Sequence, residues 1–253
     1  MKKIVCLSVL LSSLLFTSCM LENAHINFSD GHRIEPSNNI VKNEYKLSAF
    51  DQVEVNVMAN VQYIQGKAND YRVVLSCPDN YVELFSFEVE RGQNELDIEF
   101  TRRKINIEAK HVDITIYAPT LSKLENSGIA SVEIDRLKTD RLKVVNSGVG
   151  TLYLSGLQLM DLDANCSGVG NVELNGEVNR AELVCGGVGS IKGERLKAKA
   201  VKAEVSGVGG ISCYASETIE GEVSGVGALK YAGNPQAKSL KRTGVGGISE
   251  ITE

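Results

Sequence analysis

The chain has no tryptophan, only three histidines and an aromatic content of 6% over its 253 residues. With so few aromatic rings, a platform of stacked rings for binding sugars is not expected. The histidines, His25, His32 and His111, lie outside the glycine-rich C-terminal half, and none stands at a ligand spacing from a cysteine. A zinc site and a Ser/His/Asp or Cys/His nucleophile therefore have little support, and we expect no metal, no cofactor and no catalysis.

Long apolar runs are also missing, except at the very beginning of the chain. Lys2 and Lys3 precede an apolar stretch at residues 4–16, and Thr17-Ser18-Cys19 follows it. The stretch is too short to span a bilayer, and its flanks are those of a secretory signal peptide. Residues 1–18 are therefore predicted to be removed during export.

Residues 14–19, Leu-Leu-Phe-Thr-Ser-Cys, resemble a bacterial lipobox. The resemblance implies that Cys19 becomes the first mature residue and carries acyl chains that hold the protein on a membrane. The alternative is an ordinary signal peptide with an incidental cysteine. Residues 19–45 are rich in Asn and Ser and are predicted to be a lipidated polar tether. We expect a lipoprotein of the outer membrane in the cell envelope, with its surface or periplasmic orientation left open.

Basic residues are also outnumbered, with 27 Lys and Arg against 32 Asp and Glu. The formal net charge is −5, and because residues 1–18 hold Lys2 and Lys3 but no acid, their removal leaves −7. Nucleic acid and anionic lipid both demand a basic surface, so this balance argues against either as the main ligand. A protein or glycan ligand stays open, and so does the oligomeric state.

Glycine, by contrast, is abundant and is arranged in a repeat. The seven copies are centred on Gly128, Gly148, Gly168, Gly187, Gly207, Gly225 and Gly244. The steps between these glycines are 20, 20, 19, 20, 18 and 19 residues, and four of the copies read Ser-Gly-Val-Gly. A fixed period in this range is typical of a solenoid, in which each repeat packs only against its neighbours.

The aligned positions of the repeat predict strands. The positions two, four and six residues before the central glycine are mainly apolar, and those between them are mainly charged, as in Arg141-Leu142-Lys143-Val144. This alternation predicts a strand with one face inside. After the glycine, two more columns are predicted to point inward. They are Val149, Val169, Val188, Val208, Val226 and Val245, and Val132, Leu152, Val172, Ile191, Ile211, Leu229 and Ile248.

The fold class that follows is all-β: a right-handed parallel β-helix with about 19–20 residues per coil over residues 121–253. Paired glycines permit the tight corner that each coil needs. The outward columns carry charges whose vertical neighbours are mostly opposite in sign, such as Arg141 beside Asp161. They form either a charged binding face or, more simply, solvated pairs that contribute little energy.

Residues 46–120 are also β-rich but less regular, with turn residues at Gly66, Pro78 and Gly92. They form either irregular first coils of the β-helix or a small sheet that caps it. We favour the coils, because residues 117–121 lead into the repeats without a linker.

Cys166 and Cys185 occupy one inward column on adjacent coils. Their Cα atoms are expected to lie about 5 Å apart, which is within disulfide range. Side chains in parallel register point the same way, however, which makes the bond angle awkward. Two buried free thiols are therefore favoured over a disulfide.

Three segments carry a resemblance to a known family. Residues 50–55 (Phe-Asp-Gln-Val-Glu-Val), residues 118–124 (Ala-Pro-Thr-Leu-Ser-Lys-Leu) and the Ser-Gly-Val-Gly repeats resemble the putative auto-transporter adhesin, head GIN domain family. The resemblance covers roughly residues 45–250 and implies an exported β-helix protein of Bacteroides-like bacteria. It offers no active-site residues to carry over.

Three functions stay open at this point. The first is a cell-envelope adhesin or binding module that presents a rigid β-helix on a lipidated tether. The second is a structural or self-associating envelope protein that uses an open coil edge at the N-terminal end. The third is a glycan-active β-helix enzyme. A cluster of carboxylates on one face of residues 50–120 would favour the enzyme, and an uncovered apolar patch would favour the other two.

Overall fold

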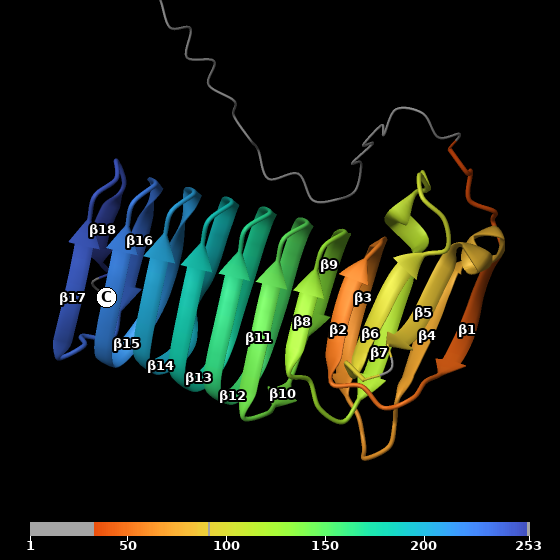
Figure 1. Cartoon of the computed structure of the whole chain (residues 1–253), viewed down its shortest axis with the longest axis horizontal. Coiled ribbons are helices and arrows are strands. Elements are labelled where there is room, and N and C mark those ends of the chain that lie inside the picture. The colour runs from red at the N-terminus through yellow and green to blue at the C-terminus, as the bar shows by residue number, and fades with distance from the viewer. Residues whose placement is uncertain (1–32, 91, 252–253) are drawn as a thin grey trace, which may run out of the picture.

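The computed structural model describes residues 33–90 and 92–251. The predicted signal peptide and Cys19 lie outside the described residues. The described chain forms one elongated stack of β-coils, with the N-terminal region at one end and the last repeat at the other (Figure 1). In the part of the chain that is described, no helix has the length and apolar character needed to cross a membrane.

The described chain is almost entirely β-strand. In chain order the first strands are β1 (Ile40–Lys46), β2 (Gln52–Asn56), β3 (Met58–Gln65), β4 (Arg72–Pro78), β5 (Phe85–Glu90), β6 (Glu95–Phe100), β7 (Asp113–Ala118), β8 (Lys123–Asn126) and β9 (Ile129–Ile134). The remaining strands are β10 (Leu137–Lys138), β11 (Arg141–Asn146), β12 (Val149–Cys166), β13 (Val169–Cys185), β14 (Val188–Val205), β15 (Val208–Val223), β16 (Val226–Ala232), β17 (Ala237–Arg242) and β18 (Gly247–Glu250). The described residues also include the short 3-10 helices η2 (Asp79–Leu84) and η3 (Ala109–His111).

The repeats form the predicted parallel β-helix. β12 pairs in parallel with β13, β13 with β14, β14 with β15, and β15 with both β16 and β17. The pairing keeps the repeats aligned, so that Val149 lies beside Val169 and Cys166 beside Cys185. In Figure 1 the near-wall strands run upward, the chain passes behind them at the top, and each new coil is added to the left. The solenoid is therefore right-handed, and the predicted fold class is confirmed.

The N-terminal region stacks two coils out of chain order. β2 and β3 pair in parallel with β8 and β9 on one side, and with β6 and β7 on the other. Residues 52–65 are thus inserted between residues 95–118 and the first repeat. On the far side of β6 and β7, β5 pairs antiparallel with β6, and β4 pairs antiparallel with β7. β1 pairs antiparallel with β4, and η2 lies alongside (Figure 1). This region therefore contains both arrangements considered for it, two coils and a cap.

The polar segment expected to form a tether through residue 45 joins the fold earlier than that. Ile34 and Tyr45 pack against the hydrophobic core, and β1 forms the outermost strand of the cap. Alternate positions of β1 are half-buried, which is the pattern of a strand with one face on a sheet. From Arg33 onward, the predicted tether is part of the folded domain.

The interior of the solenoid is filled by the alternating columns. The residues six before the central glycine are at most 4% exposed: Leu142, Leu162, Ala181, Val201 and Ile219. The residues at the position four after the central glycine are at most 1% exposed in the first six repeats: Val132, Leu152, Val172, Ile191, Ile211 and Leu229. Ile248, in the last coil, is half-buried against the same core. Both columns therefore face inward as predicted.

The valine column directly after the glycine does not face inward, and that prediction was wrong. Val149 is 40% exposed and Val245 is 85% exposed, with the four valines between them at 53–59%. At the corner, the N–H groups of Ser167 and Gly168 both donate to the carbonyl oxygen of Asn146, at 3.0 and 2.9 Å. The register of neighbouring coils is unshifted across this corner, with Asn146 beside Cys166 and Val149 beside Val169, so the alternation of the strand continues through it. The valine stands three residues after the inward Cys166 column, an odd step, and therefore faces outward.

The glycines on either side of each valine allow the coils to approach closely at this corner. A Cβ at Gly168 would overlap the carbonyl oxygen of Gly148 in the coil before it. Gly170 has a φ of 145°, which side chains rarely adopt, and a Cβ there would overlap the oxygen of Gly150. The seven central glycines occupy the same place in every repeat.

Candidate functional site

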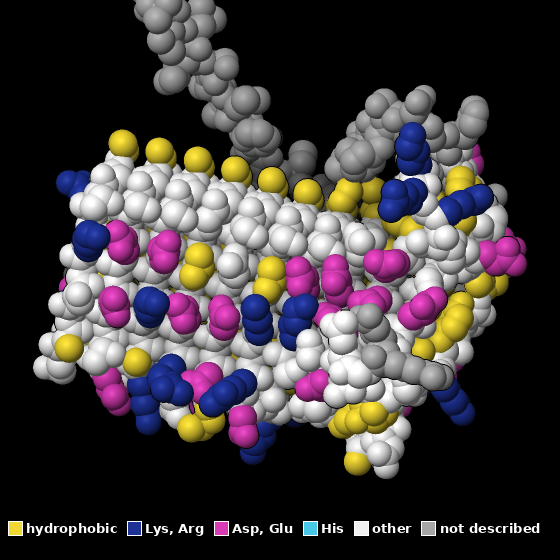
Figure 2. Space-filling model, in the orientation of Figure 1, with side chains coloured by type: hydrophobic (Ala, Val, Ile, Leu, Met, Phe, Trp, Pro, Cys, Tyr) yellow, Lys and Arg dark blue, Asp and Glu magenta, His cyan; other side chains and the backbone are white. Residues whose placement is uncertain are grey.

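The outward valines form a continuous row along one edge of the solenoid, which we call the valine ridge: Val149, Val169, Val188, Val208, Val226 and Val245. In-register pairing extends the row to Ile129 beside Val149 and to Met58 beside Ile129, both half-buried. At the coil spacing of about 4.8 Å, the row from Met58 to Val245 is roughly 34 Å long. It stands out in Figure 2 as a line of apolar side chains along the upper edge.

The band around the ridge carries no charge. For each of the six valines, the two residues before it and the two after it are Ser, Thr, Gly, Ala or Asn. These residues are small, so the valine side chains project beyond their surroundings. An aliphatic row that projects from an uncharged band is available for contact along its whole length.

The apolar area of the ridge is modest. Full burial of a valine stabilises by about 1.5–3 kcal/mol at about 25 cal/mol per Å², which corresponds to about 60–120 Å² for each side chain. Six valines that are about half exposed therefore offer on the order of 200–400 Å² of apolar surface. A stable protein–protein interface needs about 800 Å² on each partner. The ridge alone is too narrow for such an interface.

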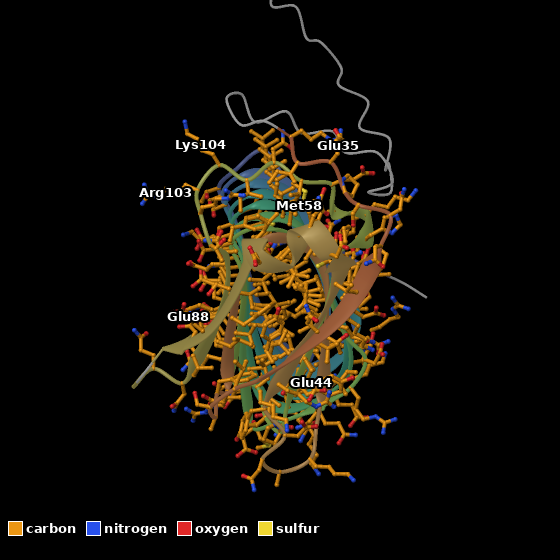
Figure 3. The ribbon with its side chains drawn as sticks, turned by 90° about the vertical axis from the view of Figure 1, so that its right-hand side faces the viewer. Glu35, Glu44, Met58, Glu88, Arg103 and Lys104 are labelled. Atoms are coloured by element: carbon orange, nitrogen blue, oxygen red, sulfur yellow. The ribbon has the colours of Figure 1, made fainter. Side chains whose placement is uncertain are left out.

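A basic loop lies at the N-terminal end of the ridge. Arg102, Arg103 and Lys104, between β6 and η3, are exposed, and within the described residues they make no ion pair. Together with Met58 and Ile129 they line a hollow of about 760 Å³. Figure 3 looks onto this end of the molecule and places Met58, Arg103 and Lys104 at the same edge. The site therefore combines an apolar row with three cations at one end of it.

The first described residues enter the fold at the same edge. The N–H of Ile34 donates to the carbonyl oxygen of Asn106 at 2.9 Å, directly after the basic loop. Arg33 forms ion pairs with Glu35 at 3.1 Å and with Glu108 at 3.0 Å. Figure 3 shows Glu35 at the edge that carries Met58, and Glu44, in β1, at the opposite edge. The chain that precedes Arg33 therefore joins the domain beside the ridge.

The outward charged columns of the near wall form ion pairs between coils, as their alternating signs predict. Arg180 Nε lies 2.6 Å and Arg141 Nε 3.5 Å from the Asp161 carboxylate, and Lys202 Nζ lies 2.9 Å from Glu182. Hydrogen bonding to Arg180 holds the pKa of Asp161 below its ordinary value. Figure 2 shows these charges spread in rows over the wall below the ridge. Such exposed pairs typically contribute about 0–1 kcal/mol each.

A second group, which the sequence reasoning missed, is an acidic column in the first coils. Asp97, Glu54 and Glu125 lie in register on the adjacent strands β6, β2 and β8. Lys123 Nζ binds Glu125 at 2.9 Å and Glu95 at 2.8 Å. Burial alone would lower the pKa of Lys123, but its hydrogen bonds to Glu95 and Glu125 raise it above the ordinary value. Because β2 is stacked out of chain order, no spacing in the sequence brings these residues together.

Another hollow lies over the middle of the long strands β12–β15. It is a shallow depression of about 910 Å³ lined by Met160, Lys197 and Tyr214, among others. The Lys197 ammonium sits 3.8 Å from the centre of the Tyr214 ring, a cation–π contact. In the described residues no group of His, Cys, Asp and Glu side chains is arranged to hold a metal ion.

The four cysteines among the described residues are buried free thiols. Cys166 and Cys185 lie side by side in register, and each thiol donates to a carbonyl of its own coil, at 3.4 Å to Gly170 and 3.5 Å to Gly189. Hydrogen bonding to Cys185, together with burial, raises the pKa of the Cys166 thiol. Burial also raises the pKa of Cys77 to about 11 and that of Cys213 to about 12. These thiols are packing residues of the core.

The comparison with protein families agrees with the repeat and the fold. The family model described as "putative auto-transporter adhesin, head GIN domain" matches residues 49–235. The chain belongs to this family. The matched region includes both out-of-order coils and most of the valine ridge. No protein of the curated set is similar enough to this chain to count as a match.

Solved structures show the same architecture. A putative adhesin from Bacteroides fragilis is 35% identical, with a TM-score of 0.82, and the match covers 86% of this chain and all of that one. A putative lipid binding protein from Parabacteroides distasonis is 23% identical, with a TM-score of 0.72 and coverages of 87% and 100%. A putative adhesin from Parabacteroides merdae is 18% identical, with a TM-score of 0.65 and coverages of 87% and 99%. The first supports the family, and the other two share the fold.

Proposed function

We propose that this family member is a non-catalytic, adhesin-type binding protein of the cell envelope. In this proposal acyl chains on Cys19 anchor it to the outer membrane, and its solenoid serves as a rigid support for the valine ridge. The ridge and the basic loop beside it form the binding edge. The adhesin descriptions of the family and of the B. fragilis relative support a binding role.

The observation that carries the proposal is the outward direction of the ridge. The corner geometry needs glycines beside each valine, but it does not need the valine, because that side chain points into solvent. A small or polar residue would satisfy the fold equally well. Six exposed valines in one line are therefore better explained by contact with a partner than by packing within the domain.

The experiment compares a ridge variant with a matched wall variant. The ridge variant carries Val169→Ser, Val188→Ser and Val208→Ser, and the wall variant carries Lys143→Gln, Lys192→Gln and Lys202→Gln. Purified proteins are incubated with envelope fractions of the producing bacterium, and the fraction of each protein that sediments with the envelope is measured. We expect the ridge variant to lose retention and the wall variant to keep it. Equal retention of the ridge variant and the unaltered protein would refute the binding edge.

The anchor has a separate test. Changing Cys19→Ala removes the residue that would carry the acyl chains and leaves the described fold untouched. We expect the altered protein to move from the membrane fraction to the soluble fraction, and labelled palmitate to disappear from it. A protein with Cys19→Ala that stays acylated and membrane-bound would show that the anchor lies elsewhere.

A glycan-active role is the second candidate, and the acidic column favours it. Same-facing carboxylates on adjacent coils are about 4.8 Å apart at the backbone, close to the separation of about 5–5.5 Å found in retaining glycosidases. Against this, the nearby hollow, which Asp97 helps to line, measures only about 220 Å³. Hydrolysis of envelope glycans that is lost with Glu54→Gln would favour catalysis over binding.

Self-association through an open coil edge at the N-terminal end has little support, although within the described residues β1 and β5 each pair with another strand on one side only. The antiparallel strands β1, β4 and β5 occupy that end of the stack, together with η2. The strand edges of the coils β2–β3 and β6–β7 are paired there. A covered edge offers few free backbone groups to a second copy.

A further inference from the structure

We infer that the partner of the valine ridge is a lipid bilayer with anionic headgroups, on which the solenoid lies lengthwise with the ridge facing the lipid. This inference rests on the proposed function, because it names the partner of the same binding edge. Three observations carry it: where the chain enters the domain, where the free cations lie, and how narrow the ridge is.

The entry point of the chain places the ridge next to the predicted anchor. Cys19 precedes Arg33 by 14 residues, which span at most about 46–50 Å when fully extended. Ile34 is bound to Asn106, directly after the basic loop, and the next residue, Glu35, lies at the edge that carries Met58 (Figure 3). A lipid anchor attached there holds this edge near the membrane at a high local concentration. Weak contacts then suffice to keep the ridge on the lipid.

The local charge of this edge differs from that of the whole chain. The net charge of −7 after removal of residues 1–18 argues against anionic lipid when it is taken as an average. At 0.1 M salt, however, exposed charges interact only over about 10 Å, so the attraction of this edge to a lipid surface depends on the residues nearest to it. Arg102, Arg103 and Lys104 are exposed at the end of the ridge, and the acids Glu35 and Glu108 are both paired with Arg33.

One acid, Glu99, also lines the hollow of the basic loop, which leaves the three cations in excess there. The other carboxylates described above, including the acidic column and the ionic rows, are spread over the wall below the ridge (Figure 2). On a bilayer contacted by the ridge they would be directed away from the headgroups. Each cation close to an anionic surface strengthens binding, and this attraction falls off over about one Debye length from the surface.

The width of the ridge distinguishes lipid from a second copy of the chain. Two ridges packed together would bury only a few hundred Å² on each side, which is too little for a stable dimer. A bilayer has no such requirement, because the acyl anchor supplies most of the attachment. The ridge then needs only to orient the solenoid. An uncharged band on either side of the valines suits shallow contact with the headgroup region.

The first experiment uses the mature chain with Cys19→Ser, which lacks the acylation site but retains the whole described fold. Vesicles of phosphatidylcholine alone, or with 30% phosphatidylglycerol, are sedimented with the protein. We expect binding only to the anionic vesicles. Replacing Arg102, Arg103 and Lys104 with Gln should lower it on the order of 100-fold, and 1 M salt should reduce it similarly. The wall variant of Lys143, Lys192 and Lys202 makes the same change in charge and should retain binding.

The second experiment measures orientation. The described cysteines are all buried, so a fluorophore can be attached selectively to Val208→Cys on the ridge or to Asp163→Cys on the near wall. On anionic vesicles that contain a lipid-borne quencher, we expect quenching at position 208 and little at position 163. Equal quenching at both positions, or equal binding to neutral and anionic vesicles, would overturn the inference.

The two proposals can fail separately. Envelope retention that depends on the ridge, combined with no binding to anionic vesicles, would leave the binding edge in place and assign it to a protein or glycan partner. Ridge variants that change neither envelope retention nor vesicle binding would refute both. Circular dichroism melting of each variant is the control for folding, and the exposure of the altered side chains predicts that the fold is kept.

Discussion

Val188 and Ile191 provide the sharpest test of the direction in which the repeat columns point. They lie three residues apart on β14, yet Val188 is 55% exposed and Ile191 is fully buried. Val188→Ala removes a side chain that is less than half buried, so the cost should be about 1 kcal/mol or less. Ile191→Ala leaves a cavity inside the solenoid and should cost about 2–5 kcal/mol.

The assay is thermal and urea unfolding followed by circular dichroism. For a chain of this length, each kcal/mol lowers the melting temperature by about 2–4 °C. Val188→Ala should therefore shift it by a few degrees at most, and Ile191→Ala by roughly 5–20 °C. Aspartate sharpens the comparison, because Val188→Asp leaves the charge in water, whereas Ile191→Asp buries it and should prevent folding.

The reasoning would be refuted by the reverse order. If Val188→Asp failed to fold while Ile191→Asp folded, the outward direction of Val188 and the inward direction of Ile191 would both be wrong. Equal losses for the two alanine variants would show that the valine is anchored by contacts between coils rather than exposed. The same pair can be made at Val169 and Val172, which occupy equivalent places in the neighbouring coil.

Three further changes test the corner, the core and the buried thiols. Gly168→Ala should destabilise the solenoid by more than about 1 kcal/mol in urea unfolding, because its Cβ would overlap the carbonyl oxygen of Gly148; a neutral effect would contradict the close approach of the coils. Asn146→Ala removes the buried acceptor of the Asn126 side-chain amide, at 2.9 Å, and should cost about 1–3 kcal/mol in urea unfolding; an unchanged midpoint would contradict this buried pair. Burial raises the pKa of Cys213 to about 12, whereas the thiol of the unfolded chain ionises at about 8.5, so the free energy of unfolding should fall as pH rises from about 9 toward 12. Urea midpoints measured across this pH range should fall less steeply for Cys213→Ala than for the unaltered protein. Midpoints that fall equally for both proteins would count against the burial of this thiol.

Much of the architecture could be predicted from local patterns. The positions two, four and six residues before each glycine alternate with charged residues, and a strand with one inward face is the physical consequence. The constant step between glycines predicts stacked coils, because a solenoid repeats one unit against the next. The ion pairs Arg180–Asp161 and Lys202–Glu182 follow from that register alone.

The binding edge was less accessible, although one signal for it was present. The columns of Val188 and Ile191 are three residues apart, and in a regular strand two such columns cannot face the same side. One of them had to point outward. The alternation decides which one: Val188 stands three residues after the inward Cys185, and Ile191 stands six after it. Hydrophobicity favoured the interior for both, but the register is unshifted across the corner, so the alternation continues and the valine faces outward.

The sequence by itself determined the repeat, the coil length and most of the core, because these depend on neighbours along the chain and on a constant period. Only the tertiary structure decided the order of the N-terminal coils, in which β2 and β3 stack between β6–β7 and the first repeat. That order brings Glu54 beside Asp97 and Met58 beside Ile129, across distances in sequence that no period connects. It also places the entry of the chain, the basic loop and the ridge at one edge. Contacts between distant segments create this edge, and local preferences do not record them.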